Sequence, residues 1–124
     1  MENKTDLSIS IGTDIEEISR IENAIKRSES FAKKCFLDSE IDYCRSKNNS
    51  GKHFAVRFCA KEAFAKAVGK SCRWHDVEIK NNELGKPEII LHGKAKEEFF
   101  GCKMDISMSH SRTYATSTVV IVWK

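Results

Sequence analysis

The sequence has little of what marks membrane-bound or secreted proteins. Its longest apolar run, from Val119 to Trp123, has the length of a strand and falls well short of the roughly 20 residues of a membrane-spanning helix. The segment Met1–Asp6 also lacks the basic-then-apolar order of a signal peptide. We therefore expect a cytoplasmic protein without a membrane partner.

The cysteine pattern excludes a disulfide scaffold. The five cysteines form an odd set without a C-x-x-C pair, so neither a disulfide framework nor a zinc ribbon is favoured. We expect free, buried thiols in a reducing compartment. The sequence also has no G-x-G-x-x-G, P-loop or G-x-S-x-G motif, which argues against the folds that bind nucleotides through those loops and against an elbow-type serine nucleophile.

What is present indicates one folded domain over residues 1–124. The hydrophobic fraction of 40% and the charged fraction of 31% are those of a globular protein. The net charge of +3 is too small to indicate a nucleic-acid partner, and the aromatic residues form no stacking platform.

Positive charge is concentrated in one stretch of the chain. Its basic residues are Lys52, Arg57, Lys61, Lys66, Lys70 and Arg73. Glu62 is the only acid among them. A local basic field of this kind suits an anionic ligand or an acidic protein.

The first half of the chain is predicted to be mostly helical. The expected elements are a strand over 7–12, a helix through Ile15, Ile18, Ile21 and Ile25, a second helix from 38, and a long helix over 53–68. Thr13 or Asp14 would cap the first helix and Asp38 or Ser39 the second. Gly69 would end the long one.

The second half is predicted to contain most of the strands. The expected elements are a hairpin of 77–80 and 89–91, a short helix over 93–100, and strands over 104–110 and 114–123. Strands and helices in mixed order, without βαβ regularity, predict an α+β fold. We expect a largely antiparallel β-sheet packed with one long and several short helices.

Asp14 is the first candidate for chemistry, because it follows an apolar strand just after Gly12. A carboxylate at such a strand end stands on a rigid element and suits a metal ligand or a general base. An ordinary helix cap is the alternative, and the residues alone favour it.

Glu62 and Lys66 are one turn apart on the long helix. They favour either a surface ion pair of little consequence or an oxygen ligand beside an ammonium that steadies phosphate charge. If Asp14 met Glu62 in space, two carboxylates could hold magnesium. The spacing does not decide between these interpretations.

Two further features lie later in the chain. His110 ends an alternating, serine-rich strand, which suits either phosphate binding or a structural histidine. Gly85-Lys86-Pro87 has the composition of a turn, and taken alone it indicates a hairpin connection.

Taken together and in this order, four segments resemble the holo-acyl-carrier-protein synthases. They are I-G-T-D-I-E-E-I-S-R-I at 11–21, R-F-C-A-K-E-A-F-A-K-A at 57–67, G-K-P at 85–87 and I-S-M-S-H-S at 106–111. The helix motif at 57–67 is the most specific, although Cys59 stands where alanine is usual. The resemblance spans about residues 9–122 and implies the 4'-phosphopantetheinyl transferase fold.

The resemblance implies transfer of 4'-phosphopantetheine from coenzyme A to a serine of apo acyl carrier protein, in fatty acid biosynthesis. Adenosine 3',5'-bisphosphate is the product that leaves. Asp14 and Glu62 would hold magnesium, and manganese is the alternative ion because it accepts the same oxygen ligands. The serine proton would leave to a water near the metal or to a carboxylate, in which case Asp14 or Glu62 doubles as the base. Lys66 would neutralise charge on the phosphoryl group.

The resemblance also assigns residues to the two substrates. Six residues, here called the coenzyme positions, would bind coenzyme A: Arg57, Gly85, Lys86, Pro87, His110 and Ser111. Arg20 resembles the arginine that meets the acidic recognition helix of the carrier protein. Bacterial stand-alone members are homotrimers with active sites between subunits, and a chain of this length is similar to them.

A non-enzymatic alternative comes from the charge pattern. A basic binding module would use the helix face of Arg57, Lys61, Lys66 and Lys70 to dock an acidic protein or nucleic acid. Asp14 and Glu62 would then be dispensable.

Overall fold

The computed structural model describes residues 8–124. In chain order its elements are β1 (Ile9–Glu17), α1 (Ile18–Arg27), α2 (Glu29–Cys35), α3 (Asp38–Arg45), α4 (Ser50–Val68), the 3-10 turn η1 (Trp74–Asp76), β2 (Val77–Asn81), β3 (Pro87–Leu91), α5 (Gly93–Glu98), β4 (Lys103–His110) and β5 (Tyr114–Val122). Residue 7, where the first strand was predicted to begin, lies outside the described residues.

The strands form two antiparallel sheets. The larger has the order β1-β5-β4, so that the C-terminal strand is central, and β2 pairs with β3 in a separate hairpin. In register, β5 pairs with β1 from Ile9↔Val122 to Glu17↔Tyr114. The predicted α+β class with antiparallel pairing is confirmed.

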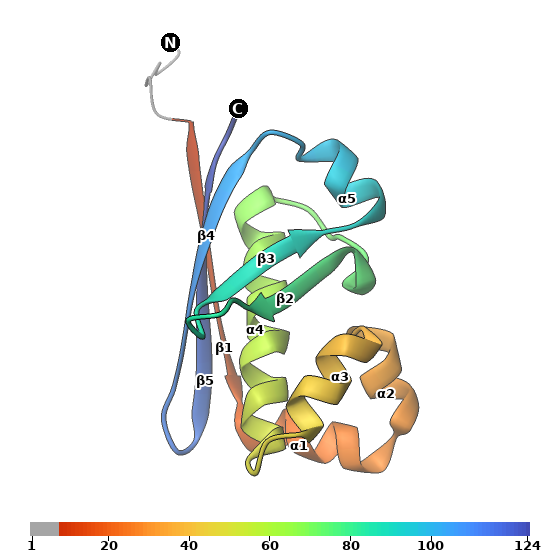
Figure 1. The fold of residues 1–124 in the computed structure, drawn as a ribbon. Coiled ribbons are helices and arrows are strands. Elements are labelled where there is room, and N and C mark those ends of the chain that lie inside the picture. The colour runs from red at the N-terminus through yellow and green to blue at the C-terminus, as the bar shows by residue number, and fades with distance from the viewer. Residues whose placement is uncertain (1–7) are drawn as a thin grey trace.

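Helix α4 is the central element of the fold. It lies along one face of the three-stranded sheet, and α1, α2 and α3 gather near its N-terminal end (Figure 1). Most of its side chains are buried, from Phe54 to Ala67. It ends at Gly69, as predicted, because the φ of 81° there is a left-handed conformation that glycine adopts without strain.

Strand β1 is longer than predicted, and its length changes where the first helix begins. It continues through Asp14 to Glu17, because β5 reaches back to Tyr114 and pairs with every residue of it. Helix α1 therefore begins only at Ile18, and the prediction that Thr13 or Asp14 caps it is wrong. Pairing with a neighbouring strand outweighed the helical spacing of the isoleucines.

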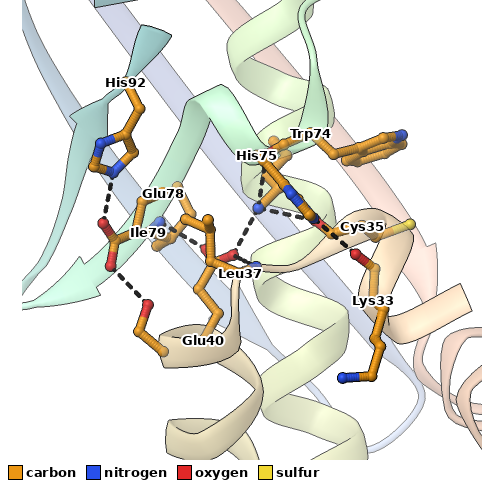
Figure 2. A network of polar contacts seen from close by, with 11 residues as sticks. Lys33, Cys35, Leu37, Glu40, Trp74, His75, Glu78, Ile79 and His92 are labelled. Carbon is orange, nitrogen blue, oxygen red and sulfur yellow. Dashed lines mark hydrogen bonds and ion pairs between the residues drawn. The ribbon is translucent and has the colours of Figure 1, made fainter. Parts of the chain in front are cut away.

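The start of α3 also differs from the prediction. Its N-cap is Leu37, whose N–H donates to Glu40 Oε1 at 2.9 Å. Asp38 and Ser39 are therefore in the first turn and do not cap the helix. The hydroxyl of Ser39 donates instead to Glu78 Oε2 of β2 at 3.0 Å, and Figure 2 shows Glu78 in this network.

A buried ion pair fixes α4 to the surrounding elements. Lys61 Nζ lies 2.7 Å from Glu40 Oε1, and the two side chains are 2% and 1% exposed. The same ammonium donates to the carbonyls of Cys35 and Trp74, at 2.9 and 3.0 Å. Glu40 Oε2 accepts from the N–H of Ile79 at 2.8 Å (Figure 2). Every charge in this cluster is therefore paired, as burial requires.

The predicted basic helix face does not exist as a surface. Arg57 and Lys61 are buried, at 2% and 4% exposure, because they face the elements packed around α4. Lys66 pairs with Asp14, and Lys70 pairs with Glu98 of α5. The binding module of the alternative interpretation therefore has no continuous basic face to use.

The cysteines are all free, and Cys35, Cys44 and Cys59 are buried. Within residues 8–124, no helix combines the length and apolar character needed to cross a membrane.

Replacing Lys61 by methionine is predicted to destabilise the protein by about 3–5 kcal/mol, because the carboxylate of Glu40 would be left buried without its partner. Urea unfolding followed by circular dichroism measures the loss. The double variant Lys61→Met/Glu40→Leu should recover part of it. A single variant as stable as the parent would contradict the structural role of the pair.

Candidate active site

Strand β1 touches α4 through its backbone at Gly12. A Cβ atom at this residue would overlap the carbonyl oxygen of Ala63 and crowd the backbone nitrogen of Ala67. Because side chains alternate along a strand, Asp14 and Glu16 point to the same side as Gly12. The close approach therefore delivers two carboxylates onto the surface of the helix.

The three predicted catalytic residues come together at this contact. Lys66 Nζ donates to Asp14 Oδ1 and to the carbonyl of Thr13, both at 3.1 Å. Burial raises the pKa of Glu62, and the negative charge of Asp14 raises it further, against the opposing effect of Lys66 and Arg20. Because the ammonium of Lys66 contacts Asp14, Lys66 forms its ion pair with that carboxylate. The surface ion pair between Glu62 and Lys66, one of the two interpretations of their spacing, is not formed.

The residues of this cluster fit a divalent cation. The side chain of Asp14 is 10% exposed, and its Oδ2 is buried without a hydrogen-bond partner. Such an unpaired oxygen is costly unless something binds it. Carboxylate oxygens are the ligands that magnesium prefers.

The cation would have few protein ligands. Within residues 8–124, no group of three or more histidine, cysteine, aspartate or glutamate side chains is arranged to hold a metal ion. Asp14 and Glu62 would therefore share the ion with water and phosphate oxygens, which is usual for magnesium.

Glu16 belongs to the cluster and was not singled out from the sequence. Its side chain is 11% exposed and pairs with the guanidinium of Arg20. Burial and the neighbouring Asp14 raise the pKa of Glu16. A strand through Glu16 would place its side chain on the same side as Asp14, two residues earlier. The sequence predicts a helix over this segment, so the spacing does not point to Glu16. Arg20 itself is exposed beside the cluster.

Four coenzyme positions line a second site. A pocket of about 240 Å³, here called the Arg57 pocket, is bordered by Tyr43, Lys52, His53, Val56, Arg57, Asn81, Gly85, Pro87, Met108 and His110. The residues come from α3, α4, β4 and the β2–β3 hairpin. The structure therefore gathers Arg57, Gly85, Pro87 and His110 around one cavity.

Lys86 and Ser111 lie outside the Arg57 pocket. The ammonium of Lys86 lies 2.7 Å from Asp105 Oδ1 of β4. Ser111 stands in the β4–β5 turn, where its hydroxyl accepts from the N–H of Tyr114 at 3.0 Å. It borders a wider neighbouring pocket together with His110 and Lys52.

Three backbone N–H groups of the β2–β3 turn are occupied by Asn82. The N–H groups of Leu84 and Lys86 both donate to Asn82 Oδ1, at 2.9 and 3.0 Å. The N–H of Gly85 donates to the carbonyl of Asn82, and Pro87 has none. At Gly85 and Pro87 the turn therefore offers a ligand a surface without free hydrogen-bond donors. Such a surface would suit packing against a flat group.

The two sites face different directions. Arg57 and Glu62 are five residues apart on α4, which at 100° per residue places them about 140° apart around the helix axis. One chain therefore carries the carboxylate cluster on one side of α4 and the Arg57 pocket on another.

Comparisons with known proteins identify the family of the chain. The sequence profile of the 4'-phosphopantetheinyl transferase superfamily matches residues 10–119. The holo-[acyl-carrier-protein] synthase of Geobacter metallireducens is 40% identical over 118 residues, which cover 89% of this chain and 94% of that protein.

Two solved structures share the fold. The Helicobacter pylori holo-[acyl-carrier-protein] synthase in complex with coenzyme A has a TM-score of 0.78 and 32% identity, covering 90% of this chain and 98% of that one. The Bacillus anthracis synthase, in complex with CoA (3',5'-ADP), has a TM-score of 0.78 and 29% identity, covering 93% and 96%.

Replacing Gly12 by alanine is predicted to push β1 away from α4, because the new methyl group overlaps helix backbone. The magnesium affinity of the variant, measured by titration calorimetry, should fall at least about tenfold. Gly51→Ala is the matched control, since Gly51 is helical and a Cβ there meets the flexible side chain of Glu22 rather than backbone. Equal losses of affinity in the two variants would contradict the role of the contact.

Replacing Glu62 by glutamine is predicted to raise the melting temperature of the metal-free protein at pH 7.5. A carboxyl whose pKa is raised in the folded state opposes folding when it is ionised, and glutamine removes that charge. The gain should shrink as the pH falls and Glu62 becomes protonated in the parent. A lower melting temperature in EDTA would contradict the crowding of Glu62 by Asp14.

Proposed function

The chain belongs to the 4'-phosphopantetheinyl transferase superfamily, and on that premise we propose that it works as a holo-acyl-carrier-protein synthase. It transfers 4'-phosphopantetheine from coenzyme A to a serine of apo acyl carrier protein and releases adenosine 3',5'-bisphosphate. We place the reaction in the cytoplasm, where it supplies holo acyl carrier protein for fatty acid biosynthesis.

The observation that carries the proposal is the buried, unpartnered Oδ2 of Asp14 beside Glu62 and Lys66. Asp14 and Glu62 would hold magnesium, or manganese in its place. When bound, the ion supplies positive charge to the pyrophosphate oxygens of coenzyme A. Lys66 adds an ammonium from the same side of α4, where it can balance the charge that develops on the transferred phosphoryl group.

The Arg57 pocket would take the adenosine end of coenzyme A. Gly85 and Pro87 offer it a surface, because the N–H of Gly85 is bonded to the Asn82 carbonyl and Pro87 has no N–H. His110 and the basic side chains around it are suited to its phosphates. Arg20, exposed beside the carboxylate cluster, is placed to meet an acidic helix of the carrier protein.

We assign the active site to the boundary between neighbouring subunits of a homotrimer. Coenzyme A has to reach both the carboxylate cluster and an Arg57 pocket, which lie on different sides of α4 in one chain. The outer face of the three-stranded sheet also exposes aliphatic side chains, with Ile9, Ile11, Ile15 and Val122 each 43–68% exposed. An apolar face of this kind suits burial against further copies of the chain.

The function is tested by incubating the protein with apo acyl carrier protein, coenzyme A and magnesium, followed by intact-mass spectrometry of the carrier protein. A mass gain of one phosphopantetheine is expected. EDTA should abolish the mass gain because it removes the metal ion. Glu62→Gln should abolish it because it removes a ligand of that ion. Glu97→Gln, an exposed change on α5, is the matched control and should stay active.

Two outcomes would contradict the proposal. One is a folded protein that neither binds coenzyme A nor modifies any carrier protein. The other is full activity in EDTA and in Glu62→Gln, which would leave the carboxylate cluster without a role in transfer.

Replacing Ile11 by aspartate is predicted to convert the trimer to a monomer, because it places a charge in the apolar outer face of the sheet. Light scattering after size exclusion should report the mass of one chain rather than three, and transfer should be lost with assembly. Ser109→Asp, on the same face but among the polar outward side chains of β4, is the control. A parent protein that is itself monomeric and active would refute the shared site.

A further inference from the structure

Asn81, the last residue of β2, lies between two of the coenzyme positions. The guanidinium of Arg57 donates through Nη2 to Asn81 Oδ1. On the other side of the same amide, Asn81 Nδ2 donates to the carbonyl of Gly85 at 2.8 Å. The two partners fix the orientation of the amide, since a guanidinium only donates and a carbonyl only accepts.

Arg57 depends on this contact for its position. It is 2% exposed, and its remaining contacts are a hydrogen bond to the carbonyl of His53 at 3.2 Å and the ring of Tyr43, 4.5 Å from the guanidinium carbon. Its Nε is buried without a partner. Within residues 8–124, Asn81 is the only side chain that accepts a hydrogen bond from this guanidinium.

The turn on the other side of Asn81 is held in the same way. Gly85 has a φ of 85°, a left-handed conformation, and its carbonyl is fixed by the amide of Asn81. Asn82 holds the N–H groups of Leu84, Gly85 and Lys86, but within the described residues no hydrogen bond joins it to α4. Asn81 is therefore the link that sets the turn against the helix.

We infer that Asn81 is a positioning residue for coenzyme A binding. It holds Arg57 of α4 and the Gly85 turn in one fixed relation, so that both walls of the Arg57 pocket are in place before the ligand arrives. The inference rests on the proposed function, because it assumes that coenzyme A occupies this pocket. Walls that are already in place raise the affinity for the ligand, because fewer side chains and loops lose conformational freedom on binding.

Asn81→Ala should raise the KM for coenzyme A about tenfold, while kcat and the KM for the carrier protein change less than about twofold, because the carboxylate cluster is untouched. Asn81→Asp keeps an acceptor for Arg57 but cannot donate to Gly85. It should show the same selective rise. Lys80→Ala, an exposed change on the same strand, is the matched control. Melting temperatures establish that each variant is folded.

A double-mutant cycle with Arg57→Lys tests whether Asn81 acts through Arg57. In that background, Asn81→Ala should raise the KM for coenzyme A much less than in the parent. An unchanged KM in Asn81→Ala would overturn the inference, as would an Asn81→Asp variant that behaves like the parent. A fall in kcat with KM unchanged would overturn it as well.

The failure of the inference can be told from that of the proposed function. Calorimetry of coenzyme A binding, run on the same proteins, does not depend on transfer. A parent that fails to transfer or to bind coenzyme A refutes the proposed function and the inference together. A parent that transfers, compared with an Asn81→Ala variant of equal coenzyme A affinity, refutes the inference alone.

Discussion

The buried ion pair of Lys61 and Glu40 joins helix α4 to the elements packed around it. Its ammonium is held by one carboxylate and two carbonyls, and that carboxylate also accepts two backbone N–H groups. Through these bonds α4 is fixed against α3, the end of α2, η1 and β2. A buried charge satisfied in this way tolerates little displacement, so the helix is a rigid support.

The support matters because α4 carries both halves of the proposed active site. On one side Gly12 lets β1 approach closely enough to set Asp14 beside Lys66 and Glu62. On another side, Arg57 forms the floor of a pocket with the β2–β3 turn. The two halves differ in direction by about 140° around the helix. The proposed sharing of the site between subunits is compatible with this geometry, since a neighbouring chain can supply the half that faces away.

The sequence predicted the helices, strands and motifs better than it predicted which strands pair and which side chains contact one another. The long helix, its glycine end and the hairpin followed from composition and local spacing. Strand β1 was cut short because its isoleucines repeat at helical spacing, whereas pairing with β5 decides its conformation. Helix α2 was not foreseen at all. The pairing of Lys61 with Glu40, 21 residues apart, and of Lys66 with Asp14 depends on tertiary packing that no local pattern encodes.

We propose that one active site takes its carboxylates from one chain and its coenzyme pocket from another. The most direct test mixes two variants, Glu62→Gln and His110→Ala, after each has been unfolded and refolded with the other. Each alone should transfer little. Random mixed trimers should regain about a quarter of the parental rate, since that share of interfaces combines two intact halves. A mixture no more active than its components would contradict the claim.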